Sequence, residues 1–296
     1  MKRREWIYGK TTAKRLAAAV LIAAFAVGLT ACGSKKEDTA QSGDSGAKII
    51  TFAYRNSGNW PIAGEDENGN PAGYDIDTLK LVDEKLQDYD FKYVGTSYDD
   101  AYIGLEAGNY DAALTNAFWT EERAEKYLIP DEALGASVLV LAVRKENADV
   151  KNLEDVSKNQ LKLAPLLAGN GMYYFVKQYN EDHPDEQVEI TTTDDSTNVA
   201  GSVEELAAGK YDAIIYTKPQ WDTTVVAEDG ANHSYLDQVS YAEFDTANTY
   251  PMFSKNVGED FLKEFNDALK SVKDSGDASK VSEKYFGYDI FNYEFQ

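Results

Sequence analysis

Arg123 is the cation in this sequence with the strongest case for binding an anion. It follows Thr120, a residue type that often caps the start of a helix, with Glu121 and Glu122 between them. Acidic residues suit the first turn of a helix, whereas a cation there is disfavoured by about 0.3–1 kcal/mol. An arginine in this place is therefore expected to have an anionic partner, and its forked guanidinium fits a carboxylate. The residues alone leave two partners open: a ligand carboxylate, or a nearby acid such as Glu122 or Asp99.

Aromatic residues are concentrated in loops that we expect to lie near Arg123. Aromatic side chains lie in protein cores more often than in ligand sites, so no single one identifies a site. As a group they predict an apolar wall beside the cation. The group comprises Trp60, Tyr98, Phe118, Trp119, Tyr173 and Tyr174.

Calcium binding has weak support. Asp66, Asn68 and Asn70 are spaced like the first ligands of an EF-hand loop, but Pro71 replaces the required glycine and Asp77 replaces the bidentate glutamate. The dipeptide Asn68-Gly69 already explains the segment as a hairpin turn.

Hydrolysis and metal catalysis have still less support. The two histidines, His183 and His233, lie in polar segments without metal-ligand spacing, and the chain has no G-x-S-x-G motif. We predict that both histidines are exposed to solvent. We also predict no catalytic residue, no metal and no cofactor.

Two segments of the chain, 105–116 and 206–217, repeat one another. Each has a glycine where a predicted helix ends, then Tyr-Asp-Ala, and then a short apolar run. This pattern predicts helices over 98–107 and 202–208, and buried strands over 112–114 and 213–215. Ligands of open parallel α/β sheets bind beyond the carboxyl ends of the strands. Thr115 and Asn116 in one copy, and Tyr216 and Thr217 in the other, should therefore face one cleft between two lobes.

The remaining patterns supply the other elements of two α/β lobes. We predict a strand over 49–54, a helix capped by Asp77, and a capping box formed by Ser97 and Asp100. A continuous apolar run over 138–143 predicts a strand that crosses between the lobes. Apolar residues at helical spacing predict a final helix pair within 254–285.

The N-terminus has the pattern of a secretory signal. Six basic residues and one acidic residue fall within residues 1–15, and an uncharged apolar run covers 16–31. The run is short for a spanning helix, which needs roughly 20 residues. Cys32 follows Leu29-Thr30-Ala31, which resembles the lipobox of bacterial lipoproteins, where the cysteine is lipidated; the alternative is an uncleaved anchor. Cys32 is the only cysteine, so no internal disulfide can form.

The composition restricts the partners. Hydrophobic residues make up 43% of the chain and charged residues 27%, which suits folded domains. The formal net charge is −22 at pH 7, although the signal segment is basic. A body this acidic is not expected to bind nucleic acid. An anionic ligand must be held by a specific cation or by backbone N–H groups.

The order and spacing of several motifs resemble the periplasmic-binding-protein-like family that serves polar-amino-acid ABC importers. The resemblance covers most of residues 48–287. The segments that carry it are Trp60-Pro61, 67–77, 97–99, 108–112, 120–123, 152–155 and 285–287.

The resemblance implies a fold and a domain arrangement. The fold is a type II, two-lobed α/β structure whose lobes are joined by two crossover strands and close on a ligand by hinge motion. We predict a signal peptide over 1–31 and a flexible tether over 32–47. Lobe 1 is predicted to comprise 48–143 plus 248–296, and lobe 2 to comprise 144–247.

The resemblance also implies site residues. Arg123 matches the family arginine that clamps the ligand carboxylate, Tyr98 matches a side chain that packs on the ligand, and Gly169-Asn170-Gly171 match a loop that offers N–H groups. Two positions depart from the family, which places acids for the ligand ammonium where this chain has Asn56 and Thr217. The full predicted binding set is Arg123, Tyr98, Trp60, Asn56, Thr115, Asn116, Phe118, Asn170, Gly171 and Thr217.

The predicted function is that of a monomeric, non-enzymatic solute-binding lipoprotein. It would be anchored at Cys32 on the extracytoplasmic face of the cell membrane and would deliver an amino acid or related carboxylate to an ABC permease. A dehydratase-like enzyme and a sensory ligand-binding domain on the same fold are the alternatives.

Overall fold

The computed structural model describes residues 46–56, 59–194 and 201–295. The predicted signal peptide, Cys32 and most of the predicted tether therefore lie outside the described residues. None of the helices in the described ranges is both long enough and apolar enough to span a membrane.

One mixed sheet runs through the described chain, with the strand order β4-β1-β5-β10-β6-β9. β1 is parallel to β4 and to β5, whereas β10 is antiparallel to β5 and to β6. The predicted strand 49–54 is confirmed as β1. The strands are β1 (Lys48–Arg55), β4 (Tyr89–Thr96), β5 (Ala112–Phe118), β6 (Gly135–Arg144), β9 (Ala213–Thr217) and β10 (Val239–Phe253).

Helices cover both faces of the β4-β1-β5 part of the sheet, which we call lobe 1. Alternate residues of β1 point to opposite faces. Phe52 packs with Leu79 and Phe265 on one face, and Ala53 packs with Leu105 on the other. The helices of lobe 1 are α1 (Tyr74–Asp83), α2 (Tyr98–Ala107), α3 (Glu121–Lys126), α8 (Glu259–Asp274) and α9 (Asp277–Phe286).

The β9 end of the sheet carries a second pair of cores, which we call lobe 2. Ile214 of β9 packs with Val203 and Trp221 on one face, and Ile215 packs with Val156 and Val176 on the other. Lobe 2 contains β9 with α4 (Leu153–Lys158), β7 (Leu166–Leu167), α5 (Gly171–Asp182), β8 (Thr192–Thr193), α6 (Gly201–Ala207) and α7 (Lys218–Trp221). The residue boundaries predicted for the lobes stay a prediction.

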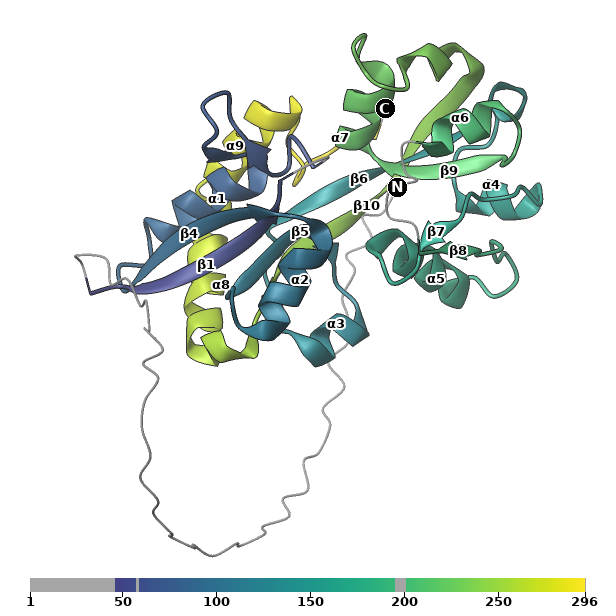
Figure 1. Ribbon diagram of the computed structural model, residues 1–296. Coiled ribbons are helices and arrows are strands. Elements are labelled where there is room, and N and C mark those ends of the chain that lie inside the picture. The colour runs from purple at the N-terminus through teal and green to yellow at the C-terminus, as the bar shows by residue number, and fades with distance from the viewer. Residues whose placement is uncertain (1–45, 57–58, 195–200, 296) are drawn as a thin grey trace, which may run out of the picture. The chain divides into compact units, whose positions relative to one another are not determined.

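β6 and β10 connect the two lobes side by side (Figure 1). They pair antiparallel from Val239 opposite Arg144 to Thr249 opposite Gly135. The register of β10 shifts twice, once between Glu243 and Asp245 and once between Tyr250 and Met252. Such bulges bend a strand locally and leave a residue unpaired.

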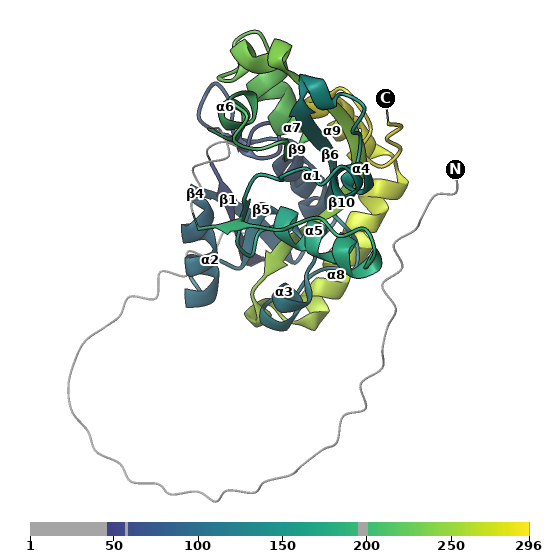
Figure 2. The same ribbon diagram turned by 90° about the vertical axis from the view of Figure 1, so that its right-hand side faces the viewer.

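Figure 2, a view turned by 90°, shows α5 and α6 of lobe 2.

Short elements complete the chain. A hairpin of β2 (Gly64–Glu65) and β3 (Pro71–Ala72) confirms the turn predicted at Asn68-Gly69. Asp66 accepts hydrogen bonds from the backbone N–H groups of Asn68 and Asn70, so its carboxylate serves the turn. The 3₁₀ and π turns are η1 (Lys145–Asn147), η2 (Asp222–Val226), η3 (His233–Gln238) and η4 (Lys255–Val257).

Several predicted helix ends are confirmed by their caps. Gly108 and Gly209 have φ of 75° and 78°, the left-handed conformation that glycine adopts most readily. The Ser97 side chain accepts a hydrogen bond from the Asp100 N–H at 3.1 Å. Thr120 caps α3 in the same way, accepting from the Arg123 N–H at 3.1 Å.

Two local predictions were wrong. Asp77 does not cap α1, because the helix begins at Tyr74 with Gly73 as its N-cap; Asp77 lies in the first turn and pairs with Lys80 and Lys284. The histidines are not simply solvated. His183 is half-buried and stacks on Tyr179, and His233 lies within hydrogen-bond distance of the Val225 carbonyl.

Candidate functional site

The Arg123 side chain points into the protein from the first turn of α3. Its residue exposure is 8%, although α3 is a short surface helix. Nη1 donates to the Phe118 carbonyl at 2.7 Å, and Nη2 reaches the Tyr98 hydroxyl at 3.5 Å. A neutral carbonyl and a phenol fix the guanidinium but do not neutralise its charge.

A local salt bridge, the second partner left open by the sequence, does not form. Within the described ranges, Arg123 has no carboxylate within the 4.0 Å of an ion pair. Glu122 instead pairs with Lys126 at 2.9 Å and accepts a hydrogen bond from the Tyr174 hydroxyl. The Tyr174 hydrogen bond and Lys126 hold the pKa of Glu122 below its ordinary value. Since a buried charge without a partner costs free energy, an anionic ligand that pairs with Arg123 would be bound favourably.

A row of tyrosines extends from Arg123 along α2 and α3. The rings of Tyr98 and Tyr102 lie 5.2 Å apart, and those of Tyr102 and Tyr127 lie 5.8 Å apart. The Tyr102 hydroxyl is 2.8 Å from Thr115 Oγ1, and the Tyr127 hydroxyl donates to Glu106 at 2.7 Å. Burial raises the pKa of Tyr98, so its hydroxyl stays protonated at neutral pH.

The arginine and the tyrosines line a cavity of about 590 Å³. This volume includes space on the solvent-open side of the cavity, and about 240 Å³ of it has room for water-sized molecules. Gly169 and Tyr174 of lobe 2 also contribute to the wall, so the cavity lies between the lobes. Its lining residues are Tyr98, Tyr102, Glu106, Glu122, Arg123, Lys126, Tyr127, Gly169 and Tyr174.

The start of α5 faces lobe 1 through a close contact. Asn170 caps the helix by accepting from the Tyr173 N–H at 2.9 Å. Gly171, the first helical residue, lies directly against the Phe118 ring, because a Cβ there would be 2.6 Å from Phe118 Cδ2. The first N–H groups of a helix lack intrahelical partners and favour anions, so this end of α5 can supply donors to a carboxylate.

Strands β5 and β9 carry three of the predicted polar residues. Thr115 and Thr217 are buried, at 7% and 8% exposure; Thr115 lies in the middle of β5, and Thr217 is the last residue of β9. Asn116 adopts φ of 55° at the bulge opposite β10, and its Nδ2 donates to Ser137 Oγ at 2.9 Å. Tyr216, by contrast, packs in the lobe 2 core against Trp221, so its ring does not face the cleft as we had expected.

Asn56 and Trp60 lie apart from this cavity wall. Asn56 is exposed, with its backbone N–H bonded to the Thr96 carbonyl at 3.0 Å. Trp60 is 48% exposed and packs edge-on against Tyr285 of α9 at 5.8 Å. Neither residue lines the 590 Å³ cavity.

Sequence reasoning missed Tyr102, Tyr127 and Glu106. Tyr98 and Tyr102 are four residues apart on one helix and must share a face, so their spacing was a usable signal. Tyr127 lies just after the short α3 and had no periodic signal. No group of three or more His, Cys, Asp or Glu side chains lies close enough to hold a metal ion in the part of the chain that the structure describes.

The fold and the site define a two-lobed binding protein, and comparison with known proteins identifies its family. The sequence pattern of "Bacterial extracellular solute-binding proteins, family 3" matches residues 50–288. The chain belongs to this family and is an extracytoplasmic substrate-binding protein of an ABC importer.

Individual relatives resemble the chain over nearly its whole length. "Probable amino-acid-binding protein YxeM" of Bacillus subtilis is 24% identical over 280 residues, covering 92% of this chain and 95% of the relative. "L-cystine-binding protein TcyK" of the same organism is 25% identical over 266 residues, covering 88% and 92%. A solved structure from work on glutathione import through GshT and the cystine importer TcyBC of Streptococcus mutans has a TM-score of 0.62. It is 27% identical and covers 82% of this chain and 97% of its own.

These comparisons confirm the predicted family, the two-lobed type II fold with two crossover strands, and the transport function. Both relatives are named as binding proteins, one for amino acids and one for L-cystine, which does not favour the dehydratase alternative.

Proposed function

We propose that the chain binds an amino acid or a related small carboxylate between its lobes, with Arg123 as the carboxylate clamp. The observation that carries this proposal is that Arg123, a residue of 8% exposure, lines the 590 Å³ cavity and has no carboxylate partner among the described residues. The guanidinium fork matches a carboxylate, and the N-terminus of α5 supplies N–H donors from the opposite lobe. The ligand then joins the two lobes through one charged group.

The cavity wall favours a ligand with a sizeable amphipathic part. Four tyrosines offer ring faces, while Glu106, Glu122 and Lys126 offer charge at the rim. The names of the relatives mention an amino acid and L-cystine, and the similar solved structure comes from work on glutathione import. Ligands of this kind have such an amphipathic part. The two family acids for the α-ammonium are replaced by Asn56 and Thr217, and neither residue lines this cavity. An ammonium held only by neutral acceptors would be discriminated weakly from a deamino analogue, whereas an acid of the cavity wall such as Glu106 or Glu122 would restore discrimination.

The experiment that tests the proposal is identification of the natural ligand followed by titration. Mass spectrometry of the small molecules released from denatured protein identifies the solute, and calorimetry with that solute gives its affinity for wild type and variants. We expect a solute with a carboxylate, returned unchanged after incubation with the protein. Turnover of the solute, or a solute without an anionic group, would contradict the proposal.

We further propose that the protein acts as a lipid-anchored monomer. Support comes from the lipobox-like Leu29-Thr30-Ala31-Cys32 after an apolar run. A lipoprotein with two or more acyl chains stays on the membrane, whereas a single chain binds marginally. Lobe closure on the ligand is part of the same proposal, and solution scattering with and without solute should show compaction.

A further inference from the structure

The C-terminal segment 287–295, which we call the C-terminal strap, leaves α9 and is fastened to lobe 1. Ser282 Oγ donates to the Tyr288 carbonyl at 2.7 Å and accepts from the Ile290 N–H at 3.0 Å. Ile290 is 5% exposed and lies on the first residue of β6, since a Cβ on Gly135 would be 3.1 Å from Ile290 Cδ1. The strap therefore starts from a fixed position beside a crossover strand.

The strap then reaches the bulge in the other crossover strand. The Tyr293 hydroxyl donates to Glu243 Oε2 at 2.6 Å, and the Tyr293 ring packs on Tyr288 at 4.7 Å. Glu243 stands just before the register shift of β10, and its side chain is 7% exposed. Because a strand bends at a bulge, the hydrogen bond from Tyr293 to Glu243 is made where β10 bends.

Glu243 continues the connection into lobe 2. Its Oε1 pairs with Lys218 Nζ at 3.0 Å, and Lys218 also pairs with Asp222 at 3.1 Å and lies 5.9 Å from the Tyr288 ring centre. Burial lowers the pKa of Lys218, but the hydrogen bonds to Glu243 and Asp222 outweigh it and leave the pKa raised. Lys218 directly follows Thr217, so this ion-pair network also fixes the end of β9.

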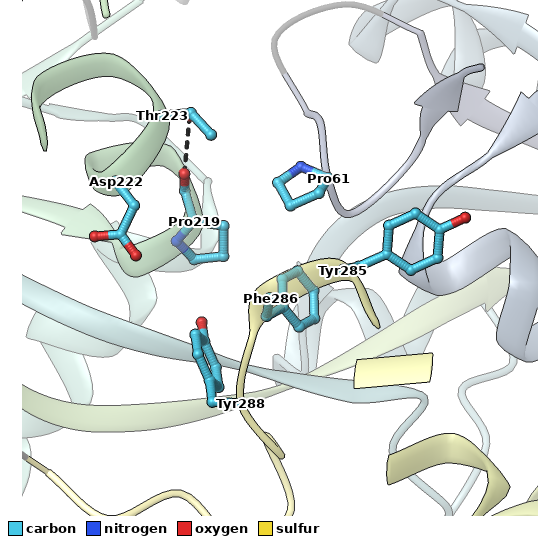
Figure 3. Close-up of a pocket in the computed structure, with 7 residues that line it drawn as sticks. All are labelled: Pro61, Pro219, Asp222, Thr223, Tyr285, Phe286 and Tyr288. Atoms are coloured by element: carbon cyan, nitrogen blue, oxygen red, sulfur yellow. Dashed lines mark hydrogen bonds between the residues drawn. The ribbon is translucent and has the colours of Figure 1, made fainter. Parts of the chain in front are cut away.

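Open space lies beside the strap. A solvent-open cavity of about 270 Å³ separates Pro61, Tyr285 and Phe286 of lobe 1 from Pro219 of α7 and from Asp222 and Thr223 of η2. Figure 3 shows Pro219, Asp222 and Thr223 on one side, Pro61 and Tyr285 on the other, and Tyr288 at the edge. The strap thus bridges the lobes beside a void that would widen or narrow as they move.

We propose that the C-terminal strap holds the lobes in the arrangement seen here by bonding Glu243 at the bulge of β10. Tyr293, Glu243 and Lys218 are positioning residues in this account, because they act on the angle between the lobes and do not line the 590 Å³ cavity. In ligand-free protein, where open and closed arrangements coexist, the strap shifts the population toward the closed one, which reduces the cost of closing when the solute binds. Its effect on affinity rests on the proposed function, but its effect on the lobe angle does not.

The test measures the lobe angle in ligand-free protein. Spin labels at Ile103→Cys on α2 and Asp185→Cys after α5 occupy exposed positions in separate lobes, in the full chain with Cys32→Ser. Distances between the labels are measured by double electron–electron resonance for the parent and for Tyr293→Phe, which removes only the hydroxyl. We expect the ratio of long to short distances to rise roughly tenfold in Tyr293→Phe, as the loss of a hydrogen bond to a charged group implies.

Tyr241→Phe is the matched control: it also removes one tyrosine hydroxyl, and Tyr241 is 42% exposed and lies on β10, the strand that carries Glu243. It should leave the distance distribution and the thermal midpoint unchanged. Glu243→Gln, which keeps an acceptor but removes the charge that pairs with Lys218, should open the lobes in the same direction as Tyr293→Phe. A distance distribution in Tyr293→Phe that matches the parent would overturn the proposal. A lowered thermal midpoint without a change in distance would also overturn it, since that result describes a purely structural contact.

Discussion

Replacing Gly171 by alanine should weaken solute binding without weakening the fold. The added methyl group would lie 2.6 Å from Phe118 Cδ2, 2.8 Å from Cγ and 3.1 Å from Cε2. Because Cγ is the root of the ring, the ring cannot escape by a small tilt, and the two lobes must separate at this point. Overpacking of this kind costs roughly 1–3 kcal/mol, which corresponds to about 5–150-fold in affinity if the cost falls on the closed state.

The stability of the fold should respond in the opposite sense. Alanine favours helix over glycine by up to about 1 kcal/mol, and the φ of Gly171 is not positive. Thermal unfolding of ligand-free Gly171→Ala should therefore occur at the same temperature as wild type or slightly higher. An affinity loss together with an unchanged or raised midpoint identifies a contact made on closing.

A double-mutant cycle with Phe118→Ala isolates the contact. Calorimetry with the solute identified by mass spectrometry is carried out on wild type, both single variants and the double variant. Without the ring, Gly171→Ala should cost less than about twofold, so the two changes should be strongly non-additive. Additive losses would refute the argument, because they would show that the methyl group harms binding by a route other than the Phe118 ring.

Three further changes have defined outcomes. Arg123→Ala should weaken solute binding by at least about 2 kcal/mol, roughly 30-fold, and Arg123→Lys should also weaken it; calorimetric affinity within twofold of wild type for Arg123→Ala would remove the clamp from the account. Burial raises the pKa of Asp75 to about 7, so the folded state keeps a proton that the unfolded chain loses near pH 4. The free energy of unfolding, measured by urea titration, should therefore fall by up to roughly 4 kcal/mol as pH rises from 4 to 7. Asp75→Asn should reduce this dependence on pH, and an equal dependence in wild type and variant would refute the role of Asp75. Cys32→Ser should release the protein from membranes or leave its precursor unprocessed, and retained acyl label in that variant would count against lipid anchoring.

The fold was predictable because local patterns agreed with one another. The repeated segments 105–116 and 206–217 predicted a helix end and a buried strand in each lobe, and Gly108 and Gly209 both have the left-handed conformation that the pattern required. The start of α1 was not predictable in this way. An aspartate usually indicates a cap, but the helix starts earlier, directly after Gly73, which has φ of 118° and lies where a Cβ would be 2.7 Å from the Ile62 carbonyl oxygen. That close approach is a tertiary contact that no local sequence window contains.

The site was predictable in part. The mismatch of Arg123 with the acidic start of α3 signalled an anion, and the structure shows that nearby acids do not supply it in the described chain. The partners that fix the guanidinium, the Phe118 carbonyl and the Tyr98 hydroxyl, depend on how α2 and α3 pack and could not be read from spacing. The position of Tyr216 was predicted wrongly for a similar reason: side chains alternate between the two faces of β9, and the face that carries Tyr216 is packed in the core of lobe 2.

The most direct test of the central claim pairs the Arg123 guanidinium with the ligand carboxylate in one thermodynamic cycle. Calorimetry compares the natural solute, once identified by mass spectrometry, with its carboxamide on wild type and on Arg123→Ala. We predict that the carboxamide binds wild type at least about 30-fold more weakly than the acid does. We also predict that Arg123→Ala binds the two within a few-fold of each other. An equal penalty for the carboxamide in both proteins would contradict the account, because it would place the carboxylate away from Arg123.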